Sequence, residues 1–430
     1  MVDELFPSRW SWVKLKDIQA PNTRAIVSGP FGSNIGSRFF VSNGVPVIRG
    51  NNLTTNMTRF IDNGFVFVTE EKAMELAGCE ALPGDLVFTA AGSLGQVGLI
   101  PSVAKYSKYI ISNKQMRARL NREVVDELFA FYWFSSPWMV KYIEQRNTGS
   151  SVPLINLSIL RDLPIPLPSL TEQRAIAHIL GTLDDKIELN RQLNKTLEAI
   201  AQALFKSWFV DFDPVRARME GRQPYGMDAE TAALFPDSFE DSGLGEIPRG
   251  WKVGRLDDLL VLQRGYDLPS HQRIPGPFPI ISASGPSGAH IDYKVCGPGV
   301  TTGRSGLLGK VFFVHENFWP LNTSLYVKEY RISRPIHAYH VLTSLDFEIF
   351  NAGSAVPTLN RNHVHNLPVI VPLLILIEAF ENRAMPLFRL CYQNEQQTLT
   401  LVAIRDILLP KLLSGEIRVK DAEIFVEASA

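Results

Sequence analysis

The sequence predicts a tandem α+β fold, in which each of two β-rich domains is followed by one long helix. Three observations support this prediction. They are a heptad-spaced apolar stripe over residues 171–209, short β-rich runs separated by Gly, Pro and Asn, and a second, diverged copy of the whole pattern. At 430 residues the chain is also too long for one hydrophobic core, so at least two domains are expected.

Residues 1–168 and 248–372 are predicted to form the two β-rich domains. Runs such as VPVIRG, GDLVFTA and KVFFVHE combine β-branched and aromatic residues and are bounded by turn residues, which is typical of short strands. Helical patterns are few: residues 124–146 in the first domain and roughly 337–351 in the second. Each domain is therefore expected to mix helices and strands.

The long helix of residues 169–210 follows the first domain. Pro166 and Pro168 precede it, Thr171 is a suitable N-cap, and no Pro interrupts the pattern. At this length the helix would extend for roughly 55–60 Å. An ordinary amphipathic helix on a globular core would explain this stretch equally well when it is taken alone. Its heptad positions are Ile176, Leu183, Asn190, Leu197 and Leu204.

Internal similarity makes this helix one of a pair. PSRWSWVKLKDI at 7–18 matches PRGWKVGRLDDL at 248–259, GSLGQVGLI at 92–100 matches GLLGKVFFV at 306–314, and NTGSSVPLIN at 147–156 matches NAGSAVPTLN at 351–360. The offset between copies falls from 241 to 214 and then stays at 204 through the helical part. A helix whose register matters cannot accept single insertions, whereas loop-rich domains can.

The second long helix is predicted over residues 373–420, although Pro386 and Pro410 should kink or shorten it. Both stripes carry Asn at the same step, and a buried Asn can fix the register of a helix pair. We therefore expect the two helices to pair antiparallel as a coiled coil. Residues 211–247, rich in Pro, Gly and acid, are predicted to be a connector, and 421–430 a tail. The heptad positions of the second helix are Phe380, Leu387, Asn394, Leu401 and Leu408.

Composition is that of a soluble globular protein, and the net charge of −1 is unevenly divided. Basic residues exceed acidic ones in 1–168 (17 against 14) and in 248–372 (12 against 8), while the remaining segments are acidic. Basic surface in two places is compatible with a nucleic-acid partner. Three scattered Cys without CxxC spacing, and the absence of a signal peptide or an 18-residue apolar run, indicate a cytoplasmic protein without a structural zinc site.

Catalytic motifs are not found. GRSGLLGKV at 303–311 has the wrong spacing for a phosphate-binding loop, and GSLGQVG at 92–98 does not fit a dinucleotide fingerprint. The two segments align with each other, which predicts one shared glycine turn before a strand. NRNHVHN at 360–366 is interpreted as a solvated loop or helix start, because its repeat partner has no His.

Candidate DNA contacts lie on Gly-rich turns of the two domains. A guanidinium and two amides, the groups that bind guanine and adenine edges in the major groove, occur together at Arg49, Asn51 and Asn52. Solvated turns would have the same composition, so no single residue is decisive. Basic residues suited to phosphates are Lys105, Lys108, Lys114, Arg117 and Arg119 in the first copy and Arg264, Arg273, Arg304 and Lys310 in the second.

Essentially all of residues 7–420 resembles the specificity subunits of type I restriction–modification enzymes. The segment from NTGSSVPLIN through TEQRAIAHILGTLDDKIELNRQLNKTLEAIAQALFKSWFVDFDPV resembles the central conserved region of that family. The Pro-x-x-Trp start of each unit and the LLSGEI that ends at residue 417 resemble it too. The second helix departs from the family at ILIEAFENRAMP (375–386), which lacks the Glu-Gln-x-x-Ile start.

The resemblance implies two target recognition domains, each reading one half of a bipartite DNA sequence, with the paired helices setting the gap. It implies no catalysis, metal or cofactor in this chain. Two methyltransferase subunits, and through them two restriction subunits, would be its partners, and S-adenosylmethionine, ATP and Mg²⁺ would belong to those partners. A coiled-coil scaffold that binds only proteins, or a stand-alone nuclease or methyltransferase, are the alternatives; the absence of catalytic motifs disfavours the enzymes.

Overall fold

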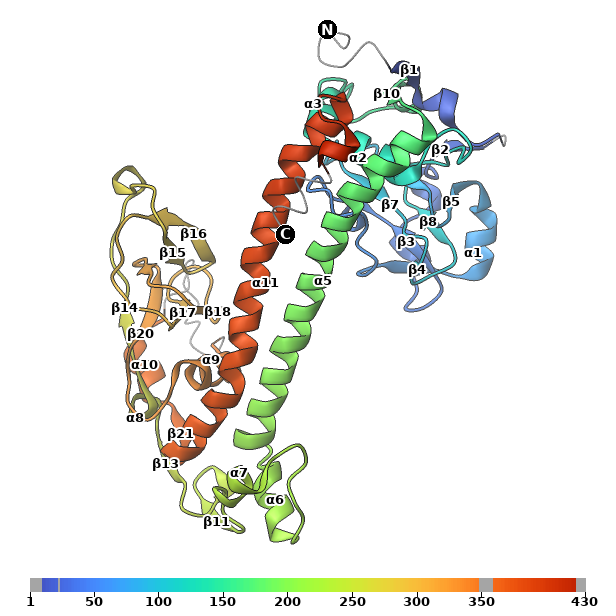
Figure 1. The fold of residues 1–430 in the computed structure, drawn as a ribbon. Helices are drawn as coiled ribbons and strands as arrows, with labels where there is room; N and C mark the ends of the chain where they lie inside the picture. The colour runs from blue at the N-terminus through green and yellow to red at the C-terminus, as the bar shows by residue number, and fades with distance from the viewer. Residues whose placement is uncertain (1–9, 22–23, 348–358, 423–430) are drawn as a thin grey trace. The chain divides into compact units, whose positions relative to one another are not determined.

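The computed structural model describes residues 10–21, 24–347 and 359–422, and it divides into two compact units. Unit 1 comprises Met1–Leu189 with Gln397–Ala430, and unit 2 comprises Asn190–Gln396. Each unit contains one β-rich domain together with parts of two long helices (Figure 1). The predicted α+β fold is therefore confirmed. Among the described helices, none combines the length and apolar character that a bilayer-crossing segment requires.

The domain of unit 1 contains two four-stranded sheets and one strand pair. The first sheet has the order β2 (Ile26–Ser28), β9 (Gln115–Ala118), β6 (Leu86–Thr89) and β7 (Val97–Leu99). The second has the order β4 (Val66–Val68), β3 (Val45–Ile48), β8 (Tyr109–Ile111) and β5 (Glu80–Ala81), with β3 and β8 parallel. The antiparallel pair β1 (Ser11–Lys14) and β10 (Pro164–Leu167) joins the two ends of the domain.

The domain of unit 2 repeats this topology. Its first sheet has the order β14 (Leu260–Arg264), β20 (Ser324–Tyr330), β17 (Gly299–Gly303) and β18 (Val311–Val314). Its second has the order β16 (Gly285–His290), β15 (Phe278–Ser282) and β19 (Trp319–Pro320), and β13 (Lys252–Arg255) pairs with β21 (Pro368–Val371). Strands β15 and β19 are parallel, like β3 and β8. The tandem duplication inferred from the sequence is thus visible in the strand order of both sheets, except that β5 has no counterpart among the described strands of unit 2.

Short helices complete the domains. Unit 1 has α1 (Glu70–Glu75), α2 (Glu127–Phe134), α3 (Pro137–Glu144), α4 (Leu157–Arg161) and the 3-10 turns η1 (Leu15–Ile18), η2 (Gly32–Asn34), η3 (Ser37–Phe39), η4 (Gly50–Asn52) and η5 (Ala77–Cys79). Unit 2 has α6 (Asp213–Met219), α7 (Ala229–Ala233), α8 (Leu256–Leu259), α9 (Pro335–Ser344), α10 (Arg361–His365) and η6 (Ser270–Gln272).

The predicted helix over 124–146 is in fact two helices, α2 and α3. Ser135 is the C-cap of the first, and Ser136 caps the second, because its hydroxyl accepts a hydrogen bond from the Met139 amide at 3.3 Å. Pro137 occupies the first turn, where its missing N–H costs nothing. The second predicted helix begins at Pro335 and ends at Ser344; its predicted end, residues 348–351, lies outside the described residues, as do 351–358 of the repeated NAGSAVPTLN.

The long helices are α5 (Leu170–Phe209) and α11 (Leu374–Ser414). The predicted N-cap Thr171 is wrong: Ser169 caps α5, its hydroxyl accepting from the Glu172 amide at 3.3 Å. Nor do Pro386 and Pro410 shorten α11, which is continuous from its start at Leu374. Both prolines lie on the exposed face, so water can solvate the carbonyl that each leaves without a helical N–H partner.

The two helices pack together antiparallel, as predicted, and unit 2 shows the contact in detail. Asn190 donates from Nδ2 to the Asn394 carbonyl at 3.4 Å, and Asn194 donates to the Cys391 carbonyl at 3.0 Å. Asn394 in turn donates to Asn194 Oδ1 at 2.8 Å. A layer of asparagines therefore lies between the helices, and sliding one helix along the other would break its bonds.

In unit 1 the helix pair contains a buried ion network. Arg405 of α11 donates to Asp184 of α5 at 2.9 Å, and the two side chains are only 9% and 10% exposed. Tyr132 of α2 donates its hydroxyl to the same carboxylate at 2.6 Å. Arg59 contacts the adjacent turn of α5, donating to the Gly181 carbonyl and to Asp185, each at 2.8 Å. The domain and both helices of unit 1 are thus bound through one set of charges.

Each unit has its own hydrophobic core, to which the heptad positions contribute. Helix α2, ELFAFYWF, is apolar on every side and is buried in the core of unit 1. The core of unit 2 packs Phe205 and Phe209 of α5 against Phe380 of α11. Of the predicted heptad positions, Ile176, Leu183, Asn190, Leu197, Phe380, Asn394, Leu401 and Leu408 are buried, and Leu204 and Leu387 are partly buried.

The segment predicted as a connector, 211–247, is folded onto unit 2. It forms α6, α7 and the hairpin of β11 (Phe239–Ser242) with β12 (Gly245–Pro248). Val215, Phe235 and Ile247 are buried in the unit 2 core, and Arg383 of α11 bonds Asp228. Apolar residues spaced among the Pro and Gly residues explain why a segment with the composition of a linker packs as a small subdomain.

Two buried histidines of α9 make the stability of unit 2 depend on pH. Burial lowers the pKa of His337 to about 3, with a further contribution from His340, and lowers that of His340 to about 4. Both are neutral in the folded unit, so their stabilisation is complete above the unfolded pKa near 6.5. We expect each histidine to lower the unfolding free energy of unit 2 by about 1.4 kcal/mol per pH unit as the pH falls from 6.5 toward the pKa of that histidine in the folded unit.

Urea unfolding of unit 2 between pH 7 and pH 4.5 measures this effect. His340→Gln should flatten the pH dependence of the unfolding free energy, whereas His178→Gln, at an exposed position of α5, should leave it unchanged. Equal slopes for wild type and His340→Gln would contradict the assignment.

Candidate nucleic-acid interface

In unit 1, four loops meet where β3 and β8 end. The parallel pairing of Ile48 with Ile111 brings the residues after each strand side by side, and Ser112 donates its amide to the Ile48 carbonyl at 2.9 Å. The turn 112–115 is central, because Gly29 donates to the Gln115 carbonyl and Ala90 to the Lys114 carbonyl, each at 2.8 Å. We call this group of loops, residues 29–34, 49–52, 91–96 and 112–115, loop cluster 1.

Close backbone contacts explain the glycines of loop cluster 1. A Cβ at Gly29 would lie 1.9 Å from the Ser112 carbonyl oxygen, so only glycine allows this approach. At Gly50 the nearest atom to such a Cβ would be Gln96 Oε1, at 3.4 Å. The predicted shared glycine turn is also present, since Gly92 and Gly95 have positive φ, as do their repeat partners Gly306 and Gly309. Gly29, Gly92 and Gly95 therefore serve backbone geometry, whereas Gly50 has room for a Cβ.

The Arg49–Asn52 segment divides into structural and accessible groups. Asn52 is fully buried: its amide donates to the Ile61 and Asn63 carbonyls, and its oxygen accepts from the Arg49 amide. It therefore holds the loop and is not accessible to a base. Asn51 is exposed, with one bond to the Gly64 carbonyl, and Arg49 is half-buried. These two, with exposed Lys114, are the predicted residues that loop cluster 1 brings together.

The remaining basic residues of the first copy lie elsewhere. Lys105 and Lys108 are near the opposite end of β8 from Lys114, and Lys108 forms an ion pair with Glu70 at 2.7 Å. Within β9, Arg117 is buried and donates to the Arg24 carbonyl, and burial lowers its pKa. Arg119 forms a two-bond ion pair with Asp85, both bonds at 2.8 Å. The basic run in the sequence is therefore not one basic surface.

Unit 2 has an equivalent loop cluster 2, formed by residues 265–267, 282–285, 304–309 and 321–323. A Cβ at Gly265 would lie 2.2 Å from the Leu321 carbonyl oxygen, which is the counterpart of the Gly29 contact. Arg304 lies in this cluster; its amide donates to the Thr323 carbonyl at 2.8 Å and its guanidinium to the Asn322 carbonyl at 3.3 Å. Arg264, next to Gly265, is 4.0 Å from Asp267.

The other candidates of unit 2 have local partners. Arg273 donates to the Leu268 and Ser287 carbonyls, and exposed Lys310 lies 5.2 Å from the centre of the Phe312 ring. The NRNHVHN segment begins a helix, which was one of the two interpretations of its sequence. Asn360 caps α10, and His365 Nε2 accepts a hydrogen bond from the Leu262 amide at 2.9 Å. In the described part of the chain, no group of three His, Cys, Asp or Glu residues could hold a metal ion.

Sequence reasoning missed several exposed members of loop cluster 1, notably Phe31, Asn34 and Asn113. The distribution of charge along the sequence could have identified the loops that carry them. No Asp or Glu occurs in residues 18–61 or in 86–122, although these segments carry ten Lys and Arg. All four loops of loop cluster 1 come from these two acid-free segments. The clearer sequence feature of loop cluster 1 is therefore the absence of negative charge from its segments, and not the positions of single basic residues.

Known proteins share both the sequence and the fold. Residues 7–199 match the family model of the type I restriction modification DNA specificity domain. The type I restriction enzyme MjaIX specificity subunit of Methanocaldococcus jannaschii is 27% identical, covering 96% of this chain and 95% of that protein. The HindI specificity subunit of Haemophilus influenzae is also 27% identical, covering 83% of this chain and 94% of its own length.

A solved structure extends the comparison to the fold. The type I restriction–modification S subunit from M. genitalium superposes with a TM-score of 0.61 at 16% identity, covering 96% of this chain and 97% of that one. The match therefore includes both β-rich domains and both long helices. Together with the domain match and the full-length relatives, it shows that the chain is similar, over nearly its whole length, to specificity subunits of type I restriction–modification enzymes.

Proposed function

We propose that the chain gives a type I restriction–modification complex its DNA sequence specificity, with each β-rich domain reading one half of a bipartite target. The observation that carries this proposal is the pair of equivalent loop clusters. Each lies at the carboxyl ends of a parallel strand pair and presents amide, hydroxyl and guanidinium groups on tight glycine turns. These are the groups that read base edges and hold phosphates.

Lys114 is the member of loop cluster 1 best placed to contact a phosphate, because it is exposed and lies in the central turn. Lys114→Ala should weaken DNA binding on all sequences alike and reduce the slope of log K against log salt by about 1. A gel-shift titration of the chain with its methyltransferase partner, at several salt concentrations, measures both. Lys195→Ala, at an exposed position of α5, is the matched control and should change neither.

We further propose that the paired helices set the gap between the two half-sites. The constant offset of 204 between the helical repeats supports this, and so does the asparagine layer, which holds one register. Spacing between half-sites on DNA must match the spacing between the parts that read them. A helix pair that cannot slide is suited to that task.

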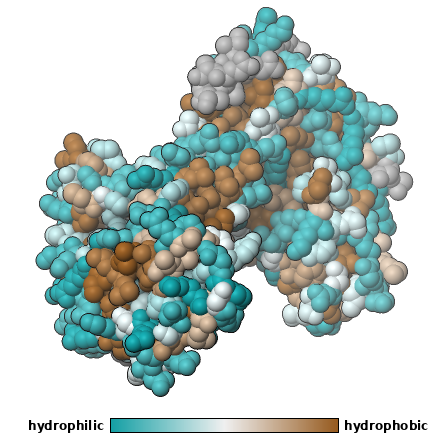
Figure 2. All heavy atoms as spheres, turned by 60° about the horizontal axis from the view of Figure 1, so that its bottom comes forward, coloured by the Kyte–Doolittle hydropathy of each residue, from teal (hydrophilic) through white to brown (hydrophobic). Residues whose placement is uncertain are grey.

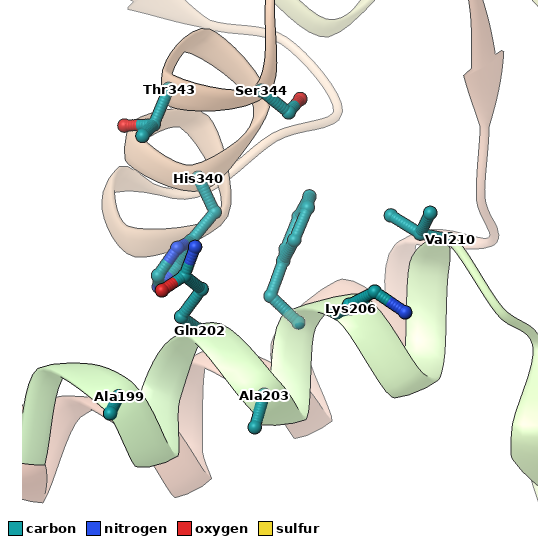
Figure 3. Close-up of a pocket in the computed structure, with 9 residues that line it drawn as sticks. Ala199, Gln202, Ala203, Lys206, Val210, His340, Thr343 and Ser344 are labelled. Atoms are coloured by element: carbon teal, nitrogen blue, oxygen red, sulfur yellow. The ribbon is translucent and has the colours of Figure 1, made fainter. Parts of the chain in front are cut away.

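Helix α5 also offers a docking surface for a methyltransferase subunit. A groove of about 440 Å³ lies between α5 and α9, lined by Ala199, Gln202, Ala203, Phe205, Lys206, Val210, His340, Thr343 and Ser344. Figure 3 shows His340 pointing from α9 toward Gln202. Its Nε2 is buried and has no hydrogen-bond partner in the described structure. Figure 2 shows that apolar patches occur on a largely hydrophilic face of the molecule.

The repeat supports two such docking surfaces. Ala203 of α5 corresponds to Ile407 of α11, which is 52% exposed, so an apolar side chain is accessible at the matching position of unit 1. Ala203→Arg would place a charge in the apolar groove, and we expect it to weaken capture of the methyltransferase subunit about 100-fold. The exposed position Lys195 of the same helix, changed to Ala, is the control. Unchanged assembly of the Ala203→Arg variant would exclude this groove as the docking site.

The chemistry of the complex belongs, on this proposal, to the partner subunits. The modification subunits would use S-adenosylmethionine and the restriction subunits ATP and Mg²⁺, while this chain supplies recognition. A scaffold that binds only proteins would not require two equivalent loop clusters, one of them lying on acid-free segments of the chain.

A further inference from the structure

We propose that Phe31 is an aromatic wedge that enters the base stack of the DNA at the half-site read by the first domain. The inference rests on the proposed reading of DNA by loop cluster 1 and adds a specificity-determining residue to it. Phe31 is 85% exposed, although the side chains at comparable positions of a folded domain are usually polar. A partner that covered this ring would gain the free energy of burying its apolar surface.

The loop that carries Phe31 is anchored on both sides. Pro30 before it is buried, and Ile35 after it is 5% exposed within a hydrophobic cluster. The backbone at Gly29 presses against the Ser112 carbonyl, and Asn34 donates its amide to the Phe31 carbonyl at 2.8 Å, which closes a 3-10 turn. The ring is thus presented by a fixed turn, which lowers the entropy lost when it binds.

The groups around the ring favour a polyanion as the partner. The turn packs on Asn113, whose amide nitrogen is 3.2 Å from where a Cβ of Gly32 would lie, and Lys114 is the next residue. Arg38 donates to the Ser33 carbonyl at 2.7 Å, so a second cation lies at the base of the turn. No acidic residue occurs from 18 to 61 or from 86 to 122. An exposed apolar side chain flanked by cations and amides is the arrangement with which proteins unstack and kink duplex DNA.

The second domain lacks this feature at the matching position. Gly265 corresponds to Gly29, because each lies against a carbonyl oxygen of the turn that follows β19 or β8. Asp267, two residues after Gly265, therefore corresponds to Phe31, two residues after Gly29. Asp267 is hydrogen-bonded to Asn322, and a carboxylate cannot enter a base stack. The proposal is therefore asymmetric: base unstacking is expected in the half-site of the first domain, and none from Asp267 in the other.

The test uses the full chain assembled with its methyltransferase partner and a duplex containing its mapped target. 2-Aminopurine is placed singly along each half-site, away from the adenines that become modified, so that base flipping by the methyltransferase does not contribute. The wild type should raise the fluorescence at one step of the first half-site several-fold. Phe31→Ala should lose that increase and bind about tenfold more weakly, and Phe31→Leu should keep most of both.

Tyr225→Ala, which removes another fully exposed ring, is the control and should behave like wild type. The wedge is overturned if Phe31→Ala binds the target and gives the wild-type fluorescence pattern, or if it binds DNA normally but no longer assembles with the methyltransferase. Failure of the wild-type complex to bind DNA at all would instead overturn the proposed function, and the wedge with it.

Discussion

Asp184→Ala should destabilise unit 1 by about 3–5 kcal/mol, because it leaves the guanidinium of Arg405 buried without its main partner. Burial lowers the pKa of Arg405, but the bonds to Asp184 and Asp406 raise it above its ordinary value, so the cation stays charged. The same substitution removes the acceptor of Tyr132, 2.6 Å away. Urea unfolding, followed by a probe in unit 1, measures the loss.

The neighbouring residue provides a matched control. Asp185 also forms an ion pair, with Arg59 at 2.8 Å, but its side chain is 70% exposed. Asp185→Ala should therefore cost no more than about 1 kcal/mol. If the two variants were equally stable, burial of the Asp184–Arg405 pair would not govern the stability of unit 1. Breaking a buried charge network is costly even where its net contribution is small.

Inserting one heptad into each long helix should lengthen the gap between half-sites by about 3 base pairs. Seven residues add about 10 Å to a helix, and B-DNA rises about 3.4 Å per base pair along each strand. Because Asn190 contacts Asn394 and Asn194 contacts Cys391, position 197 of α5 faces the region of Leu387 in α11. Matched insertions after Leu197 and after Leu387 keep the apolar stripes aligned.

Mapping of methylated adenines in cells that carry the extended chain measures the gap. Both half-site sequences should be unchanged, since the loop clusters are untouched. As a control, seven residues inserted into the turn at Gly243, where nothing lies within 4 Å of a Cβ, should leave the motif as it was. An unchanged gap in the doubly extended chain would contradict the proposed role of the helices.

Much of the fold was predictable because it depends on repeated patterns. The heptad stripe predicted both long helices, and the matched segments predicted a tandem duplication, in which β7 and β18 lie within one matched pair of segments and occupy the same place in their sheets. The asparagine step predicted a polar layer, and the structure places Asn190 against Asn394. Such periodic features report helix faces and sheet topology directly.

The errors have local physical causes. Ser136 divides one predicted helix, because it caps a new helix that begins at Pro137 within an otherwise continuous apolar pattern. Pro386 and Pro410 were expected to kink or shorten α11, but they do not shorten it. Whether a proline is tolerated depends on which face of the helix it occupies, and that is set by packing. The amide of Asn52 suggested a base contact until burial showed it bonding its own loop.

The candidate site was harder to predict than the fold. Its loops come from four separate segments that only the parallel pairing of β3 with β8 brings together. Residues near in sequence, such as Lys108 and Lys114, lie toward opposite ends of β8, while Gly29 and Gln115 are hydrogen-bonded neighbours. The sequence shows which segments are free of negative charge, and only the three-dimensional structure shows that loops from these segments lie together.

The most direct test of the account is a genome-wide map of modified adenines in cells with and without this chain, both containing the same methyltransferase subunit. The account predicts one bipartite motif, two fixed half-sites separated by a constant gap, that is methylated only when the chain is present. Methylation of the same motif without the chain, or of a motif with no gap, would contradict it.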